Sequence, residues 1–220
     1  MELLHCTGVC EMSEYGYIPE APEQSFGNNK GIFTPKDIYD LTRADKYTNY
    51  GQLELIETKT VSGASSTIFT SIQESTYNVH FLTINNYQPS VDSRHLDIRF
   101  FENGVEESAS VYQRAQQIGQ ADTSFSESKS TAIDYLLASF ATGNATNESG
   151  NSYSYFYNLG DSSKYSFQTM HQDDINSSGV FRTAFGSGVL PQASVVDQIK
   201  LFVSSGTFDC TVSLYGIAES

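Results

Sequence analysis

From residue 52 onward, hydrophobic and polar positions alternate with a period of two, which is the pattern of half-buried β-strands. In residues 208–214, for example, Phe208, Cys210, Val212 and Leu214 fall on one side of an extended chain. The pattern predicts strands at residues 53–61, 66–72, 77–86, 95–102, 108–115, 131–140, 152–159, 164–171, 179–186, 197–204 and 207–217.

Glycine- and asparagine-rich breakers separate these runs, including the tight-turn dipeptide Asn103-Gly104 and the segment 186–188. Residues 131–140 also suit a short helix, but a strand agrees better with their surroundings. A doubly wound α/β fold would need repeated helical segments of 10–15 residues, which the pattern does not offer. We therefore expect an all-β domain over residues 51–220, an antiparallel β-sandwich or jelly roll.

One helix is predicted, over residues 34–44, in front of the strands. Thr34 suits the N-cap, Pro35 the first helical position and Asp37 the third. Ile38 and Leu41 are three residues apart and share a face. A helix of about three turns needs tertiary contacts to be stable.

Residues 1–50 as a whole predict an extended arm that becomes ordered when it docks. Residues 1–30 are rich in glycine, proline and asparagine and follow neither period, yet they carry apolar side chains that a solvated linker would lack. The expected docking residues of the arm are Tyr15, Tyr17, Ile18, Phe26, Ile32, Phe33, Ile38, Tyr39 and Leu41.

Charge narrows the classes of partner. The 26 acidic and 12 basic residues give a formal net charge of -14, and no basic cluster is present to replace nucleic-acid counterions. We expect no nucleic-acid partner and no binding to anionic membranes. No apolar run approaches the roughly 20 residues of a membrane span, and the first residues do not resemble a secretory signal, so we expect synthesis in a cytoplasm.

Candidate chemistry is sparse, and we assign no catalytic, cofactor-binding or metal-binding residue. His5, Cys6 and Cys10 lack the second ligand pair that zinc sites use, so we interpret them as isolated groups of the arm. No nucleophile elbow, P-loop or dinucleotide motif occurs. The carboxylates that a glycoside hydrolase would need lie in apparent turns, where solvated acids are common: Glu102, Glu106, Glu107, Asp173 and Asp174.

The tyrosine row Tyr153, Tyr155 and Tyr157 is the strongest candidate for binding. Exposed tyrosines offer flat faces and hydroxyl groups that suit sugars and protein partners. The alternative, which we favour from the sequence, is that these rings form a wall of the core or a subunit interface.

Two segments resemble surface proteins of tailed-bacteriophage virions. Residues 31–41 (GIFTPKDIYDL) resemble segments near the N-termini of some of these proteins, and residues 199–217, which end in LYGI, resemble the C-termini of many small ones. The resemblance implies a β-sandwich displayed on a tail fibre, head fibre or capsid, anchored through residues 1–50 to a capsid or tail protein. The implied role is assembly, decoration or host attachment without enzymatic activity, and we expect symmetric copies, as a homotrimer. A carbohydrate-binding module, with a host glycan as ligand, and a polysaccharide hydrolase are the alternatives.

Overall fold

The computed structural model describes residues 24–25, 28–29, 34–44, 52–122 and 125–218. The chain divides into two units, residues 1–50 and residues 51–220. Six expected docking residues (Tyr15, Tyr17, Ile18, Phe26, Ile32 and Phe33) lie outside the described residues, as do His5, Cys6 and Cys10.

The first unit contains two short paired strands, β1 (Gln24–Ser25) and β2 (Asn28–Asn29), and the helix α1 (Pro35–Arg43). The predicted cap is confirmed, because Thr34 Oγ1 accepts from the Asp37 amide at 3.2 Å and the Asp37 carboxylate accepts from the Thr34 amide at 2.8 Å. No side chain of α1 is buried; Tyr39 is 63% exposed, Ile38 is exposed and Leu41 is half-buried.

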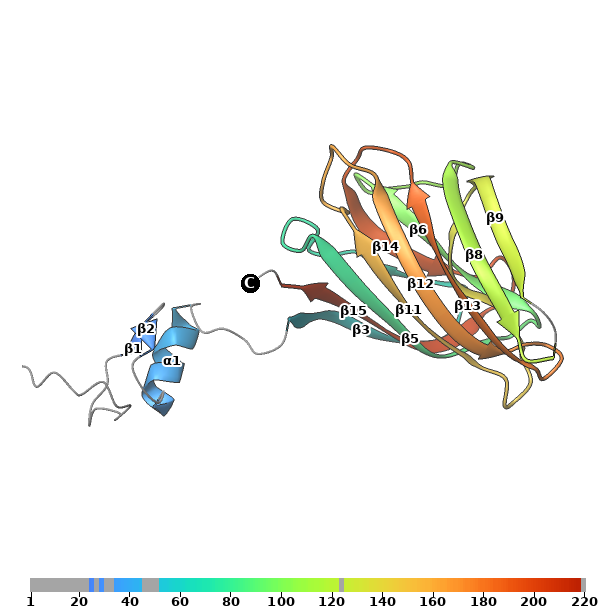
Figure 1. Ribbon diagram of the computed structural model, residues 1–220, viewed down its shortest axis with the longest axis horizontal. Coiled ribbons are helices and arrows are strands. Elements are labelled where there is room, and N and C mark those ends of the chain that lie inside the picture. Colours follow the sequence, from blue (N-terminus) through green and yellow to red (C-terminus); the bar gives the residue numbers. More distant parts are fainter. Residues whose placement is uncertain (1–23, 26–27, 30–33, 45–51, 123–124, 219–220) are drawn as a thin grey trace, which may run out of the picture. The chain divides into compact units, whose positions relative to one another are not determined.

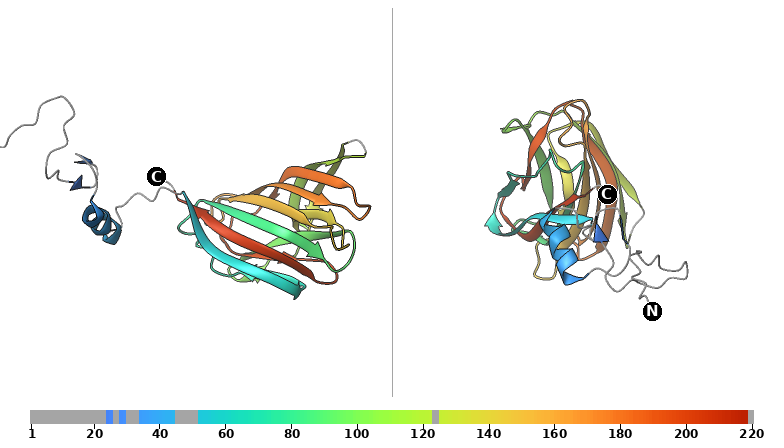
Figure 2. Two further views of the ribbon diagram at one scale, coloured as in Figure 1. Left: turned by 90° about the horizontal axis from the view of Figure 1, so that it is seen from below. Right: turned by 90° about the vertical axis from the view of Figure 1, so that its left-hand side faces the viewer.

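The second unit is a sandwich of two antiparallel sheets, so the predicted fold class is confirmed (Figures 1 and 2). The larger sheet has eight strands, in the order β3 (Leu53–Ala64), β15 (Phe208–Ile217), β5 (Val79–Pro89), β11 (Gly150–Tyr157), β12 (Ser166–Ile175), β13 (Phe181–Leu190), β8 (Tyr112–Gln120) and β9 (Ser126–Ile133). The smaller sheet has the order β10 (Leu136–Thr142), β6 (Arg94–Glu102), β14 (Val196–Phe202) and β4 (Ser66–Phe69), and β7 (Val105–Glu106) pairs with β6.

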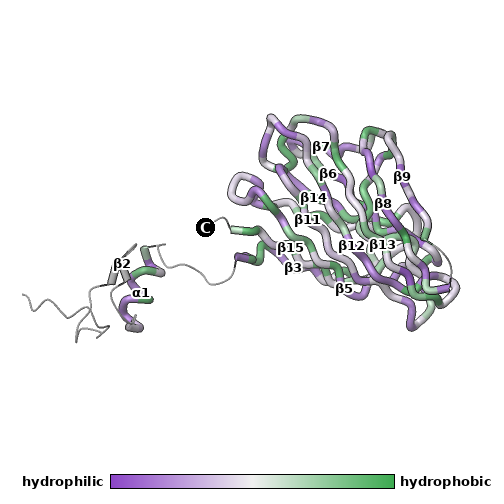
Figure 3. Tube along the Cα trace, viewed as in Figure 1, coloured by the Kyte–Doolittle hydropathy of each residue, from purple (hydrophilic) through white to green (hydrophobic). Residues whose placement is uncertain are grey.

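The hydrophobic core lies between the two sheets and follows from the alternation along each strand (Figure 3). On β15 the predicted inward face is confirmed, since Phe208, Cys210, Val212 and Leu214 are all at most 5% exposed. They pack in one cluster with residues of the smaller sheet such as Phe100. The turn predicted at Asn103-Gly104 is also confirmed: both residues have positive φ and join β6 to β7.

The single strand expected at residues 131–140 is wrong, because two strands occupy this region. β9 ends at Ile133 in the larger sheet, and β10 begins at Leu136 in the smaller one. The chain changes sheet at Asp134, whose carbonyl accepts from Arg99 Nε at 2.8 Å and whose carboxylate pairs with the same guanidinium.

The strand expected at residues 108–115 is displaced, and β9 was missed. β8 covers Tyr112–Gln120 because buried Gln116 continues the inward face that begins with Tyr112. β9 has the sequence SESKSTAI, and most of its side chains are exposed at the edge of the sheet. A polar edge strand gives little hydrophobic alternation to detect.

Residues 186–188 were expected to break a strand but lie inside β13. The two glycines are required by close packing rather than by a turn. A Cβ on Gly186 would lie 2.3 Å from the carbonyl oxygen of Ala115 on β8, and one on Gly188 would lie 2.4 Å from Leu136 Cδ2 of the other sheet. Such close approach is a known reason for glycine within a strand.

Candidate functional site

The tyrosine row lies on the outer face of the eight-stranded sheet, away from the core. Along β11, Ser152, Ser154 and Phe156 point inward and are buried, whereas Tyr153 is 41% exposed. The interpretation of these rings as a core wall is therefore wrong. Ser154 can face inward because Gln168 Nε2 of the neighbouring strand β12 donates to its Oγ at 3.0 Å, whereas the buried Ser152 Oγ has no hydrogen-bond partner among the described residues.

Strand pairing places the outer-face residues in rows that run across the strands, about 7 Å apart. The first row contains Tyr153, His171, Phe185, Gln117 and Glu127. The second row contains Leu55, Tyr215, Phe81, Tyr155, Thr169, Ser187, Ala115 and Lys129. The third row contains Leu53, Ile217, Val79, Tyr157, Phe167, Val189 and Gln113.

Over β15, β5 and β11 the rows form a packed aromatic surface. The Phe81 ring lies 4.7 Å from the Tyr155 ring, 6.0 Å from that of Tyr153 and 6.2 Å from that of Tyr215, measured between centroids. Tyr155 and Tyr157 stack at 6.5 Å. These contacts fix the rings in place before any ligand arrives.

Over β12, β13 and β8 the side chains of the second row are small, and they form the floor of a trough. The floor residues Thr169, Ser187 and Ala115 are all exposed. We define the trough as this floor together with its walls and ends. One wall contains His171, Phe185 and Gln117, the other contains Phe167, Val189 and Gln113, and the two ends are Tyr155 and Lys129. Two depressions of about 690 and 520 Å³ meet at Ser187, within the usual size of small-ligand sites.

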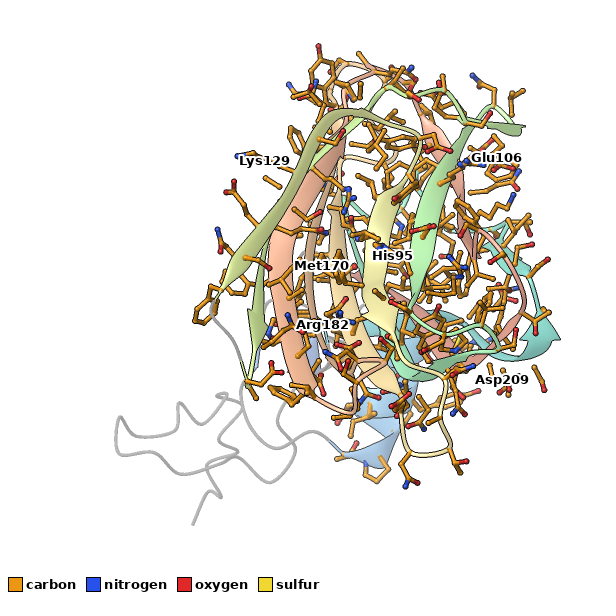
Figure 4. All side chains as sticks on the ribbon, turned by 90° about the vertical axis from the view of Figure 1, so that its right-hand side faces the viewer. His95, Glu106, Lys129, Met170, Arg182 and Asp209 are labelled. Atoms are coloured by element: carbon orange, nitrogen blue, oxygen red, sulfur yellow. The ribbon has the colours of Figure 1, made fainter. Side chains whose placement is uncertain are left out.

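The aromatic side chains beside the floor are accessible. Phe167 is 43% exposed and Phe185 is 47% exposed, from opposite walls. At one end of the trough, the ammonium of Lys129 pairs with Glu127 at 2.6 Å. In one wall, His171 Nε2 lies 3.2 Å from Thr183 Oγ1. Lys129 and Glu106 lie on opposite sides of the sandwich (Figure 4).

Beneath the trough, the inner face of β12 binds the backbone of β10. Gln168 Nε2 donates to the Leu137 carbonyl at 2.8 Å, and Gln172 Nε2 donates to the Phe140 carbonyl at 3.3 Å. The next inward residue, Asp174, forms a buried ion pair with Arg182 of β13. Asp173 and Asp174 were expected in a turn, but they lie inside β12, where Asp173 points outward and Asp174 inward. This alternation separates their carboxylates.

Burial shifts two titratable groups of β6. It raises the pKa of Asp97 to about 8, against the opposing attraction of Arg114. It lowers the pKa of His95 to about 4, and Arg114, Arg182 and Arg94 act in the same direction. Both groups are therefore neutral near pH 7. Asp97 Oδ1 has no hydrogen-bond partner among the residues that the structure describes.

The other candidate carboxylates gather around the β6–β7 hairpin and hold the structure together. Glu106 pairs with Arg99 at 2.9 Å and with Lys200 at 2.7 Å. Glu107 accepts from Gln192 at 3.0 Å, and Glu102 accepts from Ser194. Burial raises the pKa of Glu102, and the charge of Glu107 adds to this effect.

Across the described ranges, no group of three or more histidine, cysteine, aspartate or glutamate residues is placed to hold a metal ion. Cys210 is a buried free thiol, and burial raises its pKa to about 12. Among the same residues no helix is long and apolar enough to cross a membrane.

The sequence showed the spacing of the tyrosines but not the trough. Its walls come from strands distant in sequence, and a lone phenylalanine such as Phe185 carries no signal of its own. Comparison of the chain with protein-family models, with curated proteins and with solved structures gave no match.

Proposed function

We propose that the chain is a surface protein of a bacteriophage virion that binds a ligand with the outer face of its eight-stranded sheet. The observation that carries this proposal is the exposure of that face's aromatic side chains. Tyr153, Phe167 and Phe185 are each more than 40% exposed on one sheet face. Grouped exposed aromatics are typical of interaction surfaces, since their burial by a partner is favourable.

The virion assignment rests on the resemblance of residues 31–41 and 199–217 to such proteins. The second of these segments contains most of β14 and all of β15, which lie in different sheets of the sandwich. In this proposal residues 1–50 anchor the protein to a capsid or tail protein, and the sandwich is displayed for decoration or host attachment.

Helix α1 supports the anchoring role. It has nine residues, and Ile38 and Tyr39 are exposed on it. A helix of this length is marginal alone, so a partner that covers these side chains would stabilise it. In this proposal the copies assemble as a homotrimer, one of the closed symmetries that homo-oligomers adopt.

Antibodies raised against residues 51–220 test the proposal by immunogold labelling of intact particles from an infected-cell lysate. We expect label on intact particles and release of the protein only when the particles are dissociated. Label confined to the soluble fraction, after the particles have been removed, would contradict the virion assignment.

A further inference from the structure

We propose that the trough on the outer face is a binding site for a neutral saccharide chain. The inference rests on the proposed function, because it names the class of ligand that the displayed face would recognise. A sugar ring has apolar C–H faces and a rim of hydroxyl groups, so its site needs flat apolar walls together with hydrogen-bonding groups.

The walls meet the first requirement. Phe185 and Phe167 stand in the rows on either side of the floor, and Tyr155 stands at its end. The contact of Phe81 with Tyr155, at 4.7 Å between ring centroids, holds Tyr155 in place. Rigid aromatic groups lose little conformational entropy when they bind a ligand.

The floor and the walls of the trough also supply the hydrogen-bonding groups that a sugar needs. Thr169 and Ser187 present exposed hydroxyl groups between the aromatic walls. Gln113 and Gln117 are exposed on β8, in the two wall rows. Each amide offers two donors and one acceptor, and these groups match the vicinal hydroxyl groups of a sugar.

The charges around the trough favour an uncharged ligand. The residues that line its two larger depressions include no aspartate or glutamate, although the chain has a net charge of -14. Lys129 pairs with Glu127, 2.6 Å away. Arg114, the other cation that lines the larger depression, is on the inner face of β8, where its guanidinium donates to Gln116 and lies over the Tyr135 ring. The resulting near-neutral surface complements neutral sugars better than phosphate- or sulfate-rich polymers.

A second copy of the chain is a poorer occupant of the trough. A protein interface would bury the hydroxyl groups of Thr169 and Ser187 and the amides of Gln113 and Gln117, which costs free energy unless each finds a partner. The outer face offers a more apolar surface for protein contact over β3 and β15, where Leu53 and Leu55 are 51% and 59% exposed. The two halves of the face therefore differ in the chemistry that they can bind.

The test is titration of the full-length protein with neutral hexasaccharides of glucose, mannose, galactose and N-acetylglucosamine, followed by isothermal calorimetry. We expect at least one of them to bind, Phe185→Ala to weaken that binding about tenfold, and Ser187→Tyr to abolish it by filling the floor. Phe181→Ala is the matched control, because Phe181 is 48% exposed on the same strand but lies outside the trough. Circular dichroism and melting temperatures establish that each variant is folded.

Two results would overturn the saccharide assignment. One is the absence of binding to every hexasaccharide at millimolar concentration. The other is a change of oligomeric state in Phe185→Ala, measured by light scattering, which would assign the trough to a subunit interface. Particle labelling is independent of both results, so the ligand class can fail while the virion proposal stands.

Discussion

The side-chain amide of Gln172 binds both backbone groups of Phe140. The Phe140 amide donates to Gln172 Oε1, and Gln172 Nε2 donates to the Phe140 carbonyl at 3.3 Å. A side chain of the eight-stranded sheet thus takes the place of a neighbouring strand for the edge strand β10. The pairing of β10 with β6 is irregular nearby, since its register shifts after Leu137 and again after Ser139.

Replacement of Gln172 by leucine tests this bridge. The Phe140 amide would lose its partner, while the Phe140 carbonyl would keep a hydrogen bond from Arg182. We expect the free energy of unfolding to fall by about 1–3 kcal/mol, the cost of an unsatisfied buried donor. Gln113→Leu, on the exposed outer face, is the control and should change it by less than about 0.5 kcal/mol in urea denaturation. Equal effects of the two variants would contradict the bridge.

Asp174 and Arg182 form a buried ion pair, so removal of either charge should destabilise the protein. Arg182 Nε donates to Asp174 Oδ1 at 3.0 Å and Arg182 Nη2 to Oδ2 at 2.5 Å, and both side chains are buried. Asp174→Ala leaves the guanidinium without its counter-ion and should cost about 3–5 kcal/mol in chemical denaturation. The double variant Asp174→Ala with Arg182→Met should recover much of this loss, compared with the two single variants. A double variant that loses the sum of the two single effects would contradict the coupling.

Asp97 predicts a fall in stability as the pH rises through neutrality toward 8. Its pKa is about 8 in the folded protein, above the ordinary value of 3.8, so the folded state keeps a proton that the unfolded chain releases. Stability therefore decreases as the pH rises from 3.8 to 8. His95, with its pKa lowered to about 4, has the opposite effect, but only below its ordinary value of 6.5.

Between pH 6.5 and 8 the effect of Asp97 should dominate. We expect a loss of about 2 kcal/mol over this range in the wild-type protein, and a nearly flat profile in Asp97→Asn, which mimics the protonated acid. Urea denaturation at a series of pH values measures both profiles. Parallel profiles for the two proteins would show that Asp97 is ionised in the folded state.

Replacement by alanine should lower the stability more at Gly186 than at Gly104. In Gly186→Ala the new methyl group would meet the Ala115 carbonyl oxygen at 2.3 Å, so the two strands must move apart. In Gly104→Ala there is open space, and only the positive φ of 75° is unfavourable. We expect thermal denaturation to show losses of about 3 kcal/mol and about 1 kcal/mol, respectively. The reverse order would contradict the strand packing.

The sequence predicted the sandwich and the buried face of β15, but not the buried face of β11. The period of two located β11 to within two residues at each end. A preference for burying tyrosine over serine would turn Tyr153 inward. The structure does the opposite because buried amides, such as Gln168, bind carbonyl groups of β10. This requirement arises only when the two sheets pack, so no local pattern reveals it.

The same limit applies to the trough. Ser187 and Ala115 lie 72 residues apart in sequence and become neighbours only through the pairing of β13 with β8. The helix cap at Thr34 and the turn at Asn103-Gly104 were predicted correctly because their causes lie within four residues. Local chemistry was therefore visible in the sequence, whereas the binding surface was not.

Hydroxyl-radical footprinting of intact particles, compared with the isolated protein, tests the central claim most directly. The account predicts that Ile38 and Tyr39 of α1 become protected on the particle, while Tyr153, Phe167 and Phe185 stay as reactive as in the isolated protein. Protection of these three outer-face residues, with α1 still reactive, would contradict it and would assign the outer face to assembly.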